Sequence, residues 1–189
     1  RRPPPLTAAQ RARAASNREA ALQRLRSQDD PPNLYQLTGD LLHASEHFIV
    51  QQCNCTSKGV SHRPMGLSDH MFRQFPHANV YELVHGATGQ TSQPGSISVF
   101  GGWNGRGSGR GVVNLHAQVH PGRPKVEDTQ QMREAWFEAA LAELGQVDGL
   151  CSVAFPTHIG CGIAGGDWAV YREKLRAFAR ANSRVRVVL

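Results

Sequence analysis

The sequence contains no apolar run long enough to cross a lipid bilayer. A transmembrane helix needs about 20 consecutive apolar residues, and no such run occurs in the 189-residue chain, although 40% of its residues are hydrophobic. Its first five residues are basic and proline-rich, and the apolar segment of a secretory signal peptide does not follow them. We therefore expect a protein of the cytoplasm or nucleus that has no membrane partner and forms one core of ordinary size.

Cysteine is also scarce, with only four residues in the chain: Cys53, Cys55, Cys151 and Cys161. The first two are separated by a single residue, which suits neither a mutual disulfide nor the usual spacing of zinc ligands. Reduced thiols are expected, as in cytosolic proteins. We predict no metal and no cofactor; a zinc site formed by Cys53, Cys55 and His62 is the less favoured alternative.

Acidic residues are few at the N-terminus, which makes the charge uneven. Residues 1–30 carry seven arginines against three acidic side chains, so they hold +4 of the formal net charge of +6. Thr7 and Gln10 form a capping-box pattern ahead of a run rich in alanine and arginine that reaches Arg26, and this predicts a helix. Such a basic arm is either a solvated extension, which we favour, or a contact for nucleic acid or another acidic partner.

A proline-containing break, Asp29-Asp30-Pro31-Pro32, follows the arm. It predicts a basic extension over residues 1–32, partly helical or disordered, and one domain over residues 33–189. Within that domain, short apolar segments alternate with helical patterns. The predicted strands span residues 34–37, 48–53, 96–100, 112–117, 150–155 and 185–189, and the predicted helices span residues 65–75, 127–144 and 168–182.

This alternation predicts an α/β protein, a three-layer α/β/α sandwich around a mixed, mostly parallel sheet. In the strongest helical pattern, Thr129 is the expected N-cap and Gly145 the expected end. Its expected apolar face consists of Met132, Trp136, Ala140 and Leu144. Ligands of such sheets bind beyond the carboxyl ends of the strands.

The stretch from Thr157 to Trp168 lies between the strand 150–155 and the helix 168–182. It has glycines at positions 160, 162, 165 and 166, with Asp167 placed as the helix N-cap. Glycines leave backbone N–H groups accessible, and a helix N-terminus favours negative charge. The stretch therefore predicts a phosphate site, with a plain turn before a helix as the alternative.

Other polar residues also follow predicted strands. Asp40 can accept a hydrogen bond from an amino group or cap a turn, and Asn54 offers a donor and an acceptor for ribose hydroxyls. Residues near Met65 open a helix and provide further backbone donors. His116 and Gln118 end another strand.

Together these motifs resemble the macro domain, the ADP-ribose-binding family, over residues 34–189. The resemblance rests on four segments: Gly39-Asp40-Leu41, Gln51-Gln52-Cys53-Asn54, Asn114-Leu115-His116-Ala117-Gln118 and Gly160-Cys161-Gly162-Ile163-Ala164-Gly165-Gly166-Asp167-Trp168. The last segment, with Gly66-Leu67 and the run from Phe72 to Pro76, is most similar to the branch that contains ADP-ribose 1''-phosphate phosphatases and terminal ADP-ribose glycohydrolases.

The resemblance implies a ligand site. Asp40 would bind the adenine amino group with the Leu41 amide nearby, and Asn54 would face the distal ribose. A first phosphate-side loop would consist of Met65, Gly66 and Leu67. A second, cradling the diphosphate, would consist of Ile159, Gly160, Cys161, Gly162, Ile163, Ala164, Gly165 and Gly166.

One departure bears on catalysis. Glycohydrolases of the lysine–aspartate type carry a lysine and an aspartate where this chain has Ala117-Gln118 and Ala164, so the covalent lysine mechanism is not expected. The remaining candidates for positioning a water molecule or protonating a leaving group are Asn54, His116, Gln118 and Asp167.

The predicted function is therefore binding of ADP-ribose and hydrolysis of a derivative, either ADP-ribose 1''-phosphate or terminal protein-linked ADP-ribose. The alternative is a non-catalytic module that recognises ADP-ribosylated partners. A third reading, RNA binding, rests only on the arm and on Arg106 and Arg110. We expect a monomer.

Overall fold

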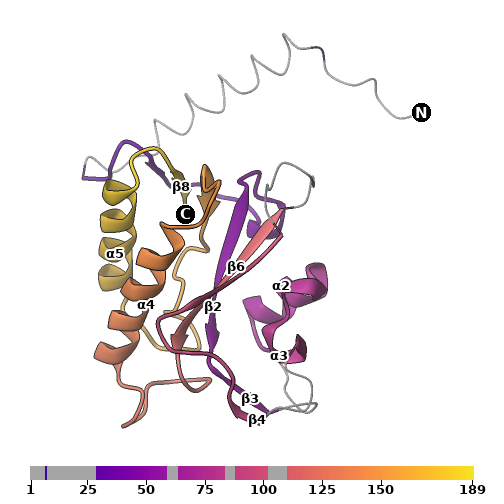
Figure 1. Cartoon of the computed structure of the whole chain (residues 1–189). Helices are drawn as coiled ribbons and strands as arrows, with labels where there is room; N and C mark the ends of the chain where they lie inside the picture. Colours follow the sequence, from indigo (N-terminus) through magenta and orange to yellow (C-terminus); the bar gives the residue numbers. More distant parts are fainter. Residues whose placement is uncertain (1–6, 8–28, 59–63, 84–87, 102–109) are drawn as a thin grey trace.

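The computed structural model of the chain describes Thr7 and residues 29–58, 64–83, 88–101 and 110–189 (Figure 1). The helix expected between Thr7 and Arg26 falls on residues of which only Thr7 is described. His62 and Arg106 also lie outside the described residues. None of the helices in the described part is both long and apolar enough to span a membrane.

A six-stranded sheet forms the centre of the domain, in the order β1-β8-β7-β2-β6-β5. All neighbouring strands are parallel except β5, which runs antiparallel to β6. The predicted mixed, mostly parallel sheet is confirmed. Its strands are β1 (Leu34–Tyr35), β2 (Phe48–Asn54), β5 (Ile97–Phe100), β6 (Gly111–Gln118), β7 (Ser152–Ala154) and β8 (Arg186–Val188).

Helices cover both faces of the sheet, as the three-layer prediction requires. Figure 1 shows α4 and α5 on one side and α2 and α3 on the other. The helices are α2 (Leu67–Gln74), α3 (Val80–Leu83), α4 (Gln130–Leu144) and α5 (Trp168–Ala181), with short 3-10 turns at Leu41–His43 and Pro76–Ala78.

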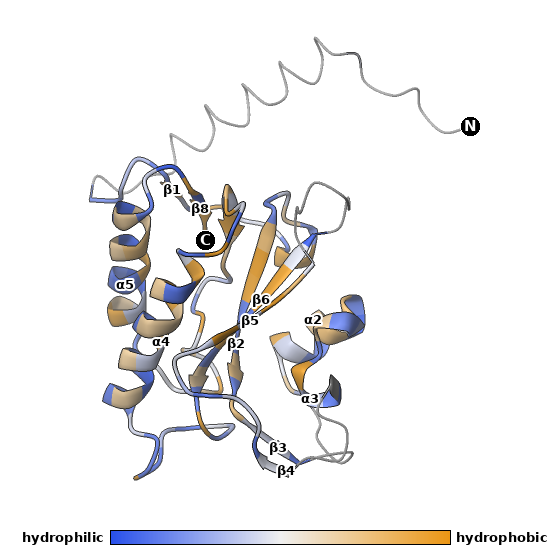
Figure 2. Ribbon diagram, in the orientation of Figure 1, coloured by the Kyte–Doolittle hydropathy of each residue, from blue (hydrophilic) through white to orange (hydrophobic). Residues whose placement is uncertain are grey.

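The burial of strand β2 on both of its faces explains why its sequence lacks an alternation of apolar and polar residues. Phe48 and Val50 pack into the larger core, which contains residues of α4 and α5, whereas Ile49 packs with Met71 of α2. Successive side chains of a strand point to opposite faces, and both faces are covered here. Figure 2 shows the resulting apolar strands in the middle of the fold.

The apolar face predicted for α4 is confirmed for Ala140 and Leu144, which are buried, and for Trp136, which packs against the core, but not for Met132. Thr129 caps the helix as expected, and Gly145 ends it. However, Met132 is 39% exposed, and the buried side chains are those of Arg133, Phe137, Ala140, Leu141 and Leu144. The prediction placed only apolar residues on the buried face, and the charged side chain of Arg133 is one of the residues that this face buries.

A two-stranded antiparallel ribbon was not predicted. Strands β3 (Thr56–Lys58) and β4 (Thr88–Gln90) pair with each other outside the main sheet. Both are three residues long and mostly polar, so they carry no periodic signal. Cys55 connects this ribbon to the main sheet, because its N–H donates to Gln118 O and its carbonyl accepts from Thr91 N. The ribbon therefore extends from the carboxyl ends of β2 and β6, where the candidate site lies.

Candidate functional site

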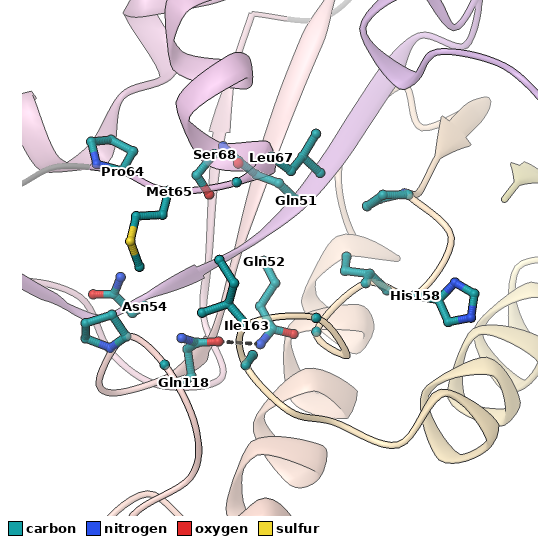
Figure 3. A pocket seen from close by; sticks show the side chains of 18 of the residues that line it. Gln51, Gln52, Asn54, Pro64, Met65, Leu67, Ser68, Gln118, His158 and Ile163 are labelled. Atoms are coloured by element: carbon teal, nitrogen blue, oxygen red, sulfur yellow. Dashed lines mark hydrogen bonds between the residues drawn. The ribbon is translucent and has the colours of Figure 1, made fainter.

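A cavity of about 710 Å³ lies at the carboxyl ends of β2, β6 and β7. One wall comes from the strand ends, another from the start of α2, and a third from the segment after β7 (Figure 3). Three stretches far apart in the sequence thus meet here because parallel strands place their carboxyl ends on one edge of the sheet. The side chains contributed by the strand ends are those of Gln51, Gln52, Asn54 and Gln118.

The start of α2 forms an uncapped helix end in the cavity wall. Gly66 is the N-cap residue, with a φ of 61° and no side-chain hydrogen bond to the first turn. Met65, Gly66, Leu67 and Ser68 all line the cavity. The first N–H groups of a helix have no partner within the helix, so this end offers donors and a favourable dipole to an anion.

Opposite α2 lies the glycine loop, which we define as residues 159–166. Part of the loop holds itself together: Cys161 N donates to His158 O at 2.9 Å, Gly165 N to Gly162 O at 3.1 Å, and Gly166 N to Gly160 O at 2.9 Å. Four other N–H groups of the loop have no acceptor among the residues that the structure describes. They belong to Gly160, Gly162, Ile163 and Ala164, and all four residues line the cavity.

The glycines of this loop occupy different structural environments. Gly160 has a φ of 73°, and a Cβ there would lie 2.5 Å from both Gln52 Oε1 and Tyr171 Cε1. A Cβ on Gly166 would lie 2.7 Å from Gly160 O. By contrast, a Cβ on Gly162 would meet no atom within 4 Å. Packing therefore requires glycine at 160 and 166, whereas at 162 it leaves space open.

The start of α2 and the glycine loop approach each other across the cavity. A Cβ added to Gly66 would lie 3.5 Å from Ile163 Cδ1. Met65 and Ile163 both line the cavity (Figure 3) and are more than half exposed. These apolar side chains form part of its rim.

Asn54 and Gln118 line the cavity as neutral amides with fixed orientations. Asn54 Nδ2 donates to Tyr81 Oη at 2.8 Å, and Asn54 Oδ1 accepts from Thr56 N at 3.1 Å. Gln118 Oε1 accepts from Gln52 Nε2 at 2.7 Å, as the dashed line in Figure 3 shows, and Gln118 Nε2 donates to a backbone carbonyl. Neither side chain can serve as a proton donor of ordinary acidity.

The other two catalytic candidates lie away from the cavity lining. The ring of His116 is buried, with Nε2 2.8 Å from Ser98 Oγ, and burial lowers the pKa of His116 to about 4. Asp167 is the N-cap of α5 and accepts from Ala169 N at 2.8 Å. The structure therefore brings together Asn54 and Gln118 but neither His116 nor Asp167.

Asp40 and Leu41 follow β1, which is separated from β7 by β8 in the sheet. The Asp40 carboxylate is exposed, accepts from Leu42 N at 3.0 Å and hydrogen-bonds with His43 Nδ1 at 2.9 Å. The His43 bond, followed by the Leu42 bond, lowers the pKa of Asp40. Of the other expected ligand residues, three are also outside the lining: Cys161, Gly165 and Gly166.

Cys161 does not supply a thiolate at neutral pH. Its half-buried thiol donates to Ile159 O at 3.2 Å, and burial raises the pKa of Cys161 to about 11. Since the thiolate is the reactive form of cysteine, this residue is an inert part of the loop.

The fold that holds this site was compared with those of known proteins. No protein-family model matches the sequence, and no curated protein matches it. Among solved structures, the macrodomain of Mycobacterium tuberculosis DarG superposes with a TM-score of 0.63 at 23% identity, covering 82% of this chain and 95% of that one. This chain has the macrodomain fold. The macrodomain of Thermus aquaticus DarG gives a TM-score of 0.61 at 22% identity, with the same coverage.

A further macrodomain structure, a mutant from Oceanobacillus iheyensis solved with ADP-ribose, gives a TM-score of 0.55 at 19% identity and covers 86% of both chains. All three identities are low, so the similarity concerns the fold. The fold class expected from the sequence is confirmed.

Several residues that line the cavity, among them Lys58 and Tyr81, were not predicted from the sequence, and His158 was predicted only as part of the stretch from Thr157 to Trp168. Lys58 reaches the cavity from β3, which had no periodic signal. His158 adopts a φ of 62°, which is uncommon for a residue other than glycine, and its ring centroid lies 4.9 Å from that of Trp168. Among the described lining residues there is no Asp or Glu. The titratable side chains of this lining are Lys58, Tyr81 and His158.

Proposed function

We propose that this chain binds ADP-ribose, with the diphosphate held between the glycine loop and the start of α2. The observation that carries the proposal is the coincidence of four free N–H groups, those of Gly160, Gly162, Ile163 and Ala164, with residues that line the cavity. Convergent backbone donors are a common way to bind phosphate groups without a metal.

The electrostatics of the cavity support an anionic ligand. Its described lining carries one lysine, Lys58, and no carboxylate. The helix end that faces the cavity is that of α2, and it has no side-chain cap. The end of α5 was expected to contribute as well, but its first turn is capped by Asp167, whose carboxylate already occupies that position. In this proposal the dipole therefore comes from α2.

The remainder of ADP-ribose is assigned by the same proposal. Asn54 faces the distal ribose, since its amide is buried at the end of β2 and is held by Tyr81. Asp40 and Leu41 receive the adenine beyond β8, where the Asp40 carboxylate is accessible. The mutant macrodomain of O. iheyensis solved with ADP-ribose supports this choice of ligand.

The geometry favours recognition of ADP-ribosylated partners over hydrolysis. A hydrolase needs a group that exchanges protons near the scissile bond, and the candidates that line the cavity, Asn54 and Gln118, are amides. His116 is buried and neutral, and Asp167 caps a helix. Hydrolysis of ADP-ribose 1''-phosphate or of terminal protein-linked ADP-ribose remains the second candidate, with Gln118 orienting a water molecule.

Titration calorimetry tests the proposal. We expect one molecule of ADP-ribose to bind per chain, more tightly than AMP, because AMP lacks the second phosphate and the distal ribose. Absence of binding by the folded protein would refute the proposal. Incubation with ADP-ribose 1''-phosphate and with a glutamate-ADP-ribosylated protein then separates the two candidates. Release of ADP-ribose that the Gln118→Ala variant abolishes would identify a hydrolase.

A further inference from the structure

Arg133 is a charged side chain buried beneath the cavity. It lies in the first turn of α4 and is 1% exposed. Its partner Asp128 is fully buried, and the two form a bidentate pair: Nε donates to Asp128 Oδ1 at 2.7 Å, and Nη2 donates to Asp128 Oδ2 at 2.6 Å. Burial alone would raise the pKa of Asp128, but the hydrogen bonds from Arg133 and from His120 N outweigh burial and lower it. The pair is thus charged at neutral pH.

The rest of the guanidinium contacts backbone carbonyls of two separate segments. Nη1 donates to Gly122 O at 2.7 Å and to Ala164 O at 3.0 Å, and Nη2 donates to His120 O at 3.2 Å. Gly122 belongs to the segment between β6 and α4, whereas Ala164 belongs to the glycine loop. Both residues line the cavity. The buried Arg133 side chain therefore connects two walls of the cavity through its hydrogen bonds.

The contact with Ala164 fixes a single peptide plane. The carbonyl of the Ala164–Gly165 peptide accepts from Arg133, and its N–H donates to Gly162 O at 3.1 Å. Both polar ends of this peptide are held. The preceding peptide carries the free N–H of Ala164, so its direction depends on the orientation that Arg133 imposes on the next peptide.

Stability alone gives a weak reason for this arrangement. Apolar residues of similar volume often replace a buried ion pair without loss of stability. A planar guanidinium offers five donors in a fixed geometry, which lysine cannot reproduce. Here those donors reach one carboxylate and carbonyls on either side of the cavity.

We infer that Arg133 is a positioning residue for ligand binding: its contact with Ala164 O orients the free N–H groups of the glycine loop toward the bound diphosphate. The inference rests on the proposed function, because it assumes that the anion lies in this loop.

The test uses Arg133→Lys and Arg133→Met in the full chain. Arg133→Lys keeps the charge beside Asp128 but loses the contacts with the carbonyls; Arg133→Met loses both. The matched control is Arg176→Met, since Arg176 Nε donates to Asp30 Oδ1 at 2.7 Å in a pair outside the cavity lining. We expect ADP-ribose affinity by calorimetry to fall at least tenfold in Arg133→Lys and further in Arg133→Met, with Arg176→Met within twofold of wild type.

A second readout separates positioning from general destabilisation. In ¹⁵N spectra of Arg133→Lys, the amides of Gly162, Ile163 and Ala164 should shift, whereas those of β2 should keep their positions. Wild-type affinity in folded Arg133→Lys, or loop amides that do not shift, would overturn the inference. If wild type itself does not bind ADP-ribose, the proposed function fails instead, and the spectra still report whether Arg133 orients the loop.

Discussion

At the scale of single residues, the glycines of the loop divide into those that the fold requires and one that the ligand would require. Gly160 has a left-handed φ and is enclosed by Gln52 and Tyr171, whereas Gly162 faces open space without a left-handed φ. Glycine is thus explained by packing and backbone conformation at position 160 and by open space for a ligand at position 162. Substitution distinguishes them because strain acts on folding and obstruction acts on binding.

Gly162→Val is expected to fold with a melting temperature close to that of wild type but to abolish ADP-ribose binding. The valine side chain would occupy space beside the free N–H groups. Circular dichroism and calorimetry measure the two effects. Gly160→Ala is the control, with an expected loss of stability of about 1–3 kcal/mol, because its Cβ would clash and its φ of 73° is strained for alanine. Normal binding by Gly162→Val would show that the loop is only a turn.

The buried ring of His116 should make stability depend on pH. Burial lowers the pKa of His116 to about 4 from its ordinary value of 6.5. Between these values the unfolded chain binds a proton that the folded chain does not, so stability falls as pH falls through this window. Urea unfolding at pH 7 and pH 4.5 should differ by about 2–3 kcal/mol from this residue. His116→Gln should lose that difference; an equal pH dependence in the variant would contradict the assignment.

At the scale of elements, two helix N-termini near the cavity differ in their capping. The first turn of α5 is capped by the Asp167 carboxylate, whereas α2 begins at Gly66 without a side-chain cap. A capped end has satisfied donors, and an uncapped end at a cavity retains them for a ligand. This contrast confirms the N-cap role predicted for Asp167, which leaves its carboxylate bonded to the helix and outside the cavity lining.

Asp167→Ala should lower the stability by about 1 kcal/mol through loss of the cap, and Asp167→Asn should not, since asparagine is an equally good N-cap. Neither change should alter ADP-ribose affinity, because Asp167 lies outside the cavity lining. Thermal unfolding and calorimetry on both variants measure these effects. Weaker binding by Asp167→Asn with unchanged stability would show that the carboxylate takes part in the site.

At the scale of the whole molecule, the boundary between extension and domain involves Asp30. Its side chain is 4% exposed and accepts from Arg172 Nη2 at 3.0 Å and from Arg176 Nε at 2.7 Å, both on α5. The prolines that follow Asp30 predict that it belongs to the extension. Its contacts instead connect this residue to the folded domain.

Removal of residues 1–28 should leave the melting temperature and the ADP-ribose affinity nearly unchanged, since this segment adds charge and few large apolar side chains. Removal of residues 1–30 also deletes Asp30 and leaves Arg172 and Arg176 without its carboxylate. A loss of about 1–2 kcal/mol would lower the melting temperature by about 2–8 °C. Calorimetric melting of both truncations measures this difference. Equal melting temperatures would show that Asp30 contributes nothing to stability.

The sequence by itself determined the sheet class and the position of the main loop. Apolar segments alternating with helical patterns imply parallel strands covered on both faces, and β2 and β6 are two of these apolar segments. Local signals of capping were also sufficient for α4 and α5, because Thr129 and Asp167 act on the turns that directly follow them. Such interactions join residues close in sequence, so pattern reasoning can find them.

Only the tertiary structure decided which polar groups share the cavity. Lys58 comes from the short strand β3, which has no periodic signal, His116 lies in the interior, and Arg133 donates to Ala164 O across 31 positions of sequence. The direction of a strand-end side chain depends on the register and on its packing partners, which the residue type does not specify. The free N–H groups of the glycine loop likewise depend on which of its amides bond within the loop. That outcome depends on the dihedral angles of a loop whose neighbours Tyr171, Gln52 and Arg133 all lie outside it in the sequence.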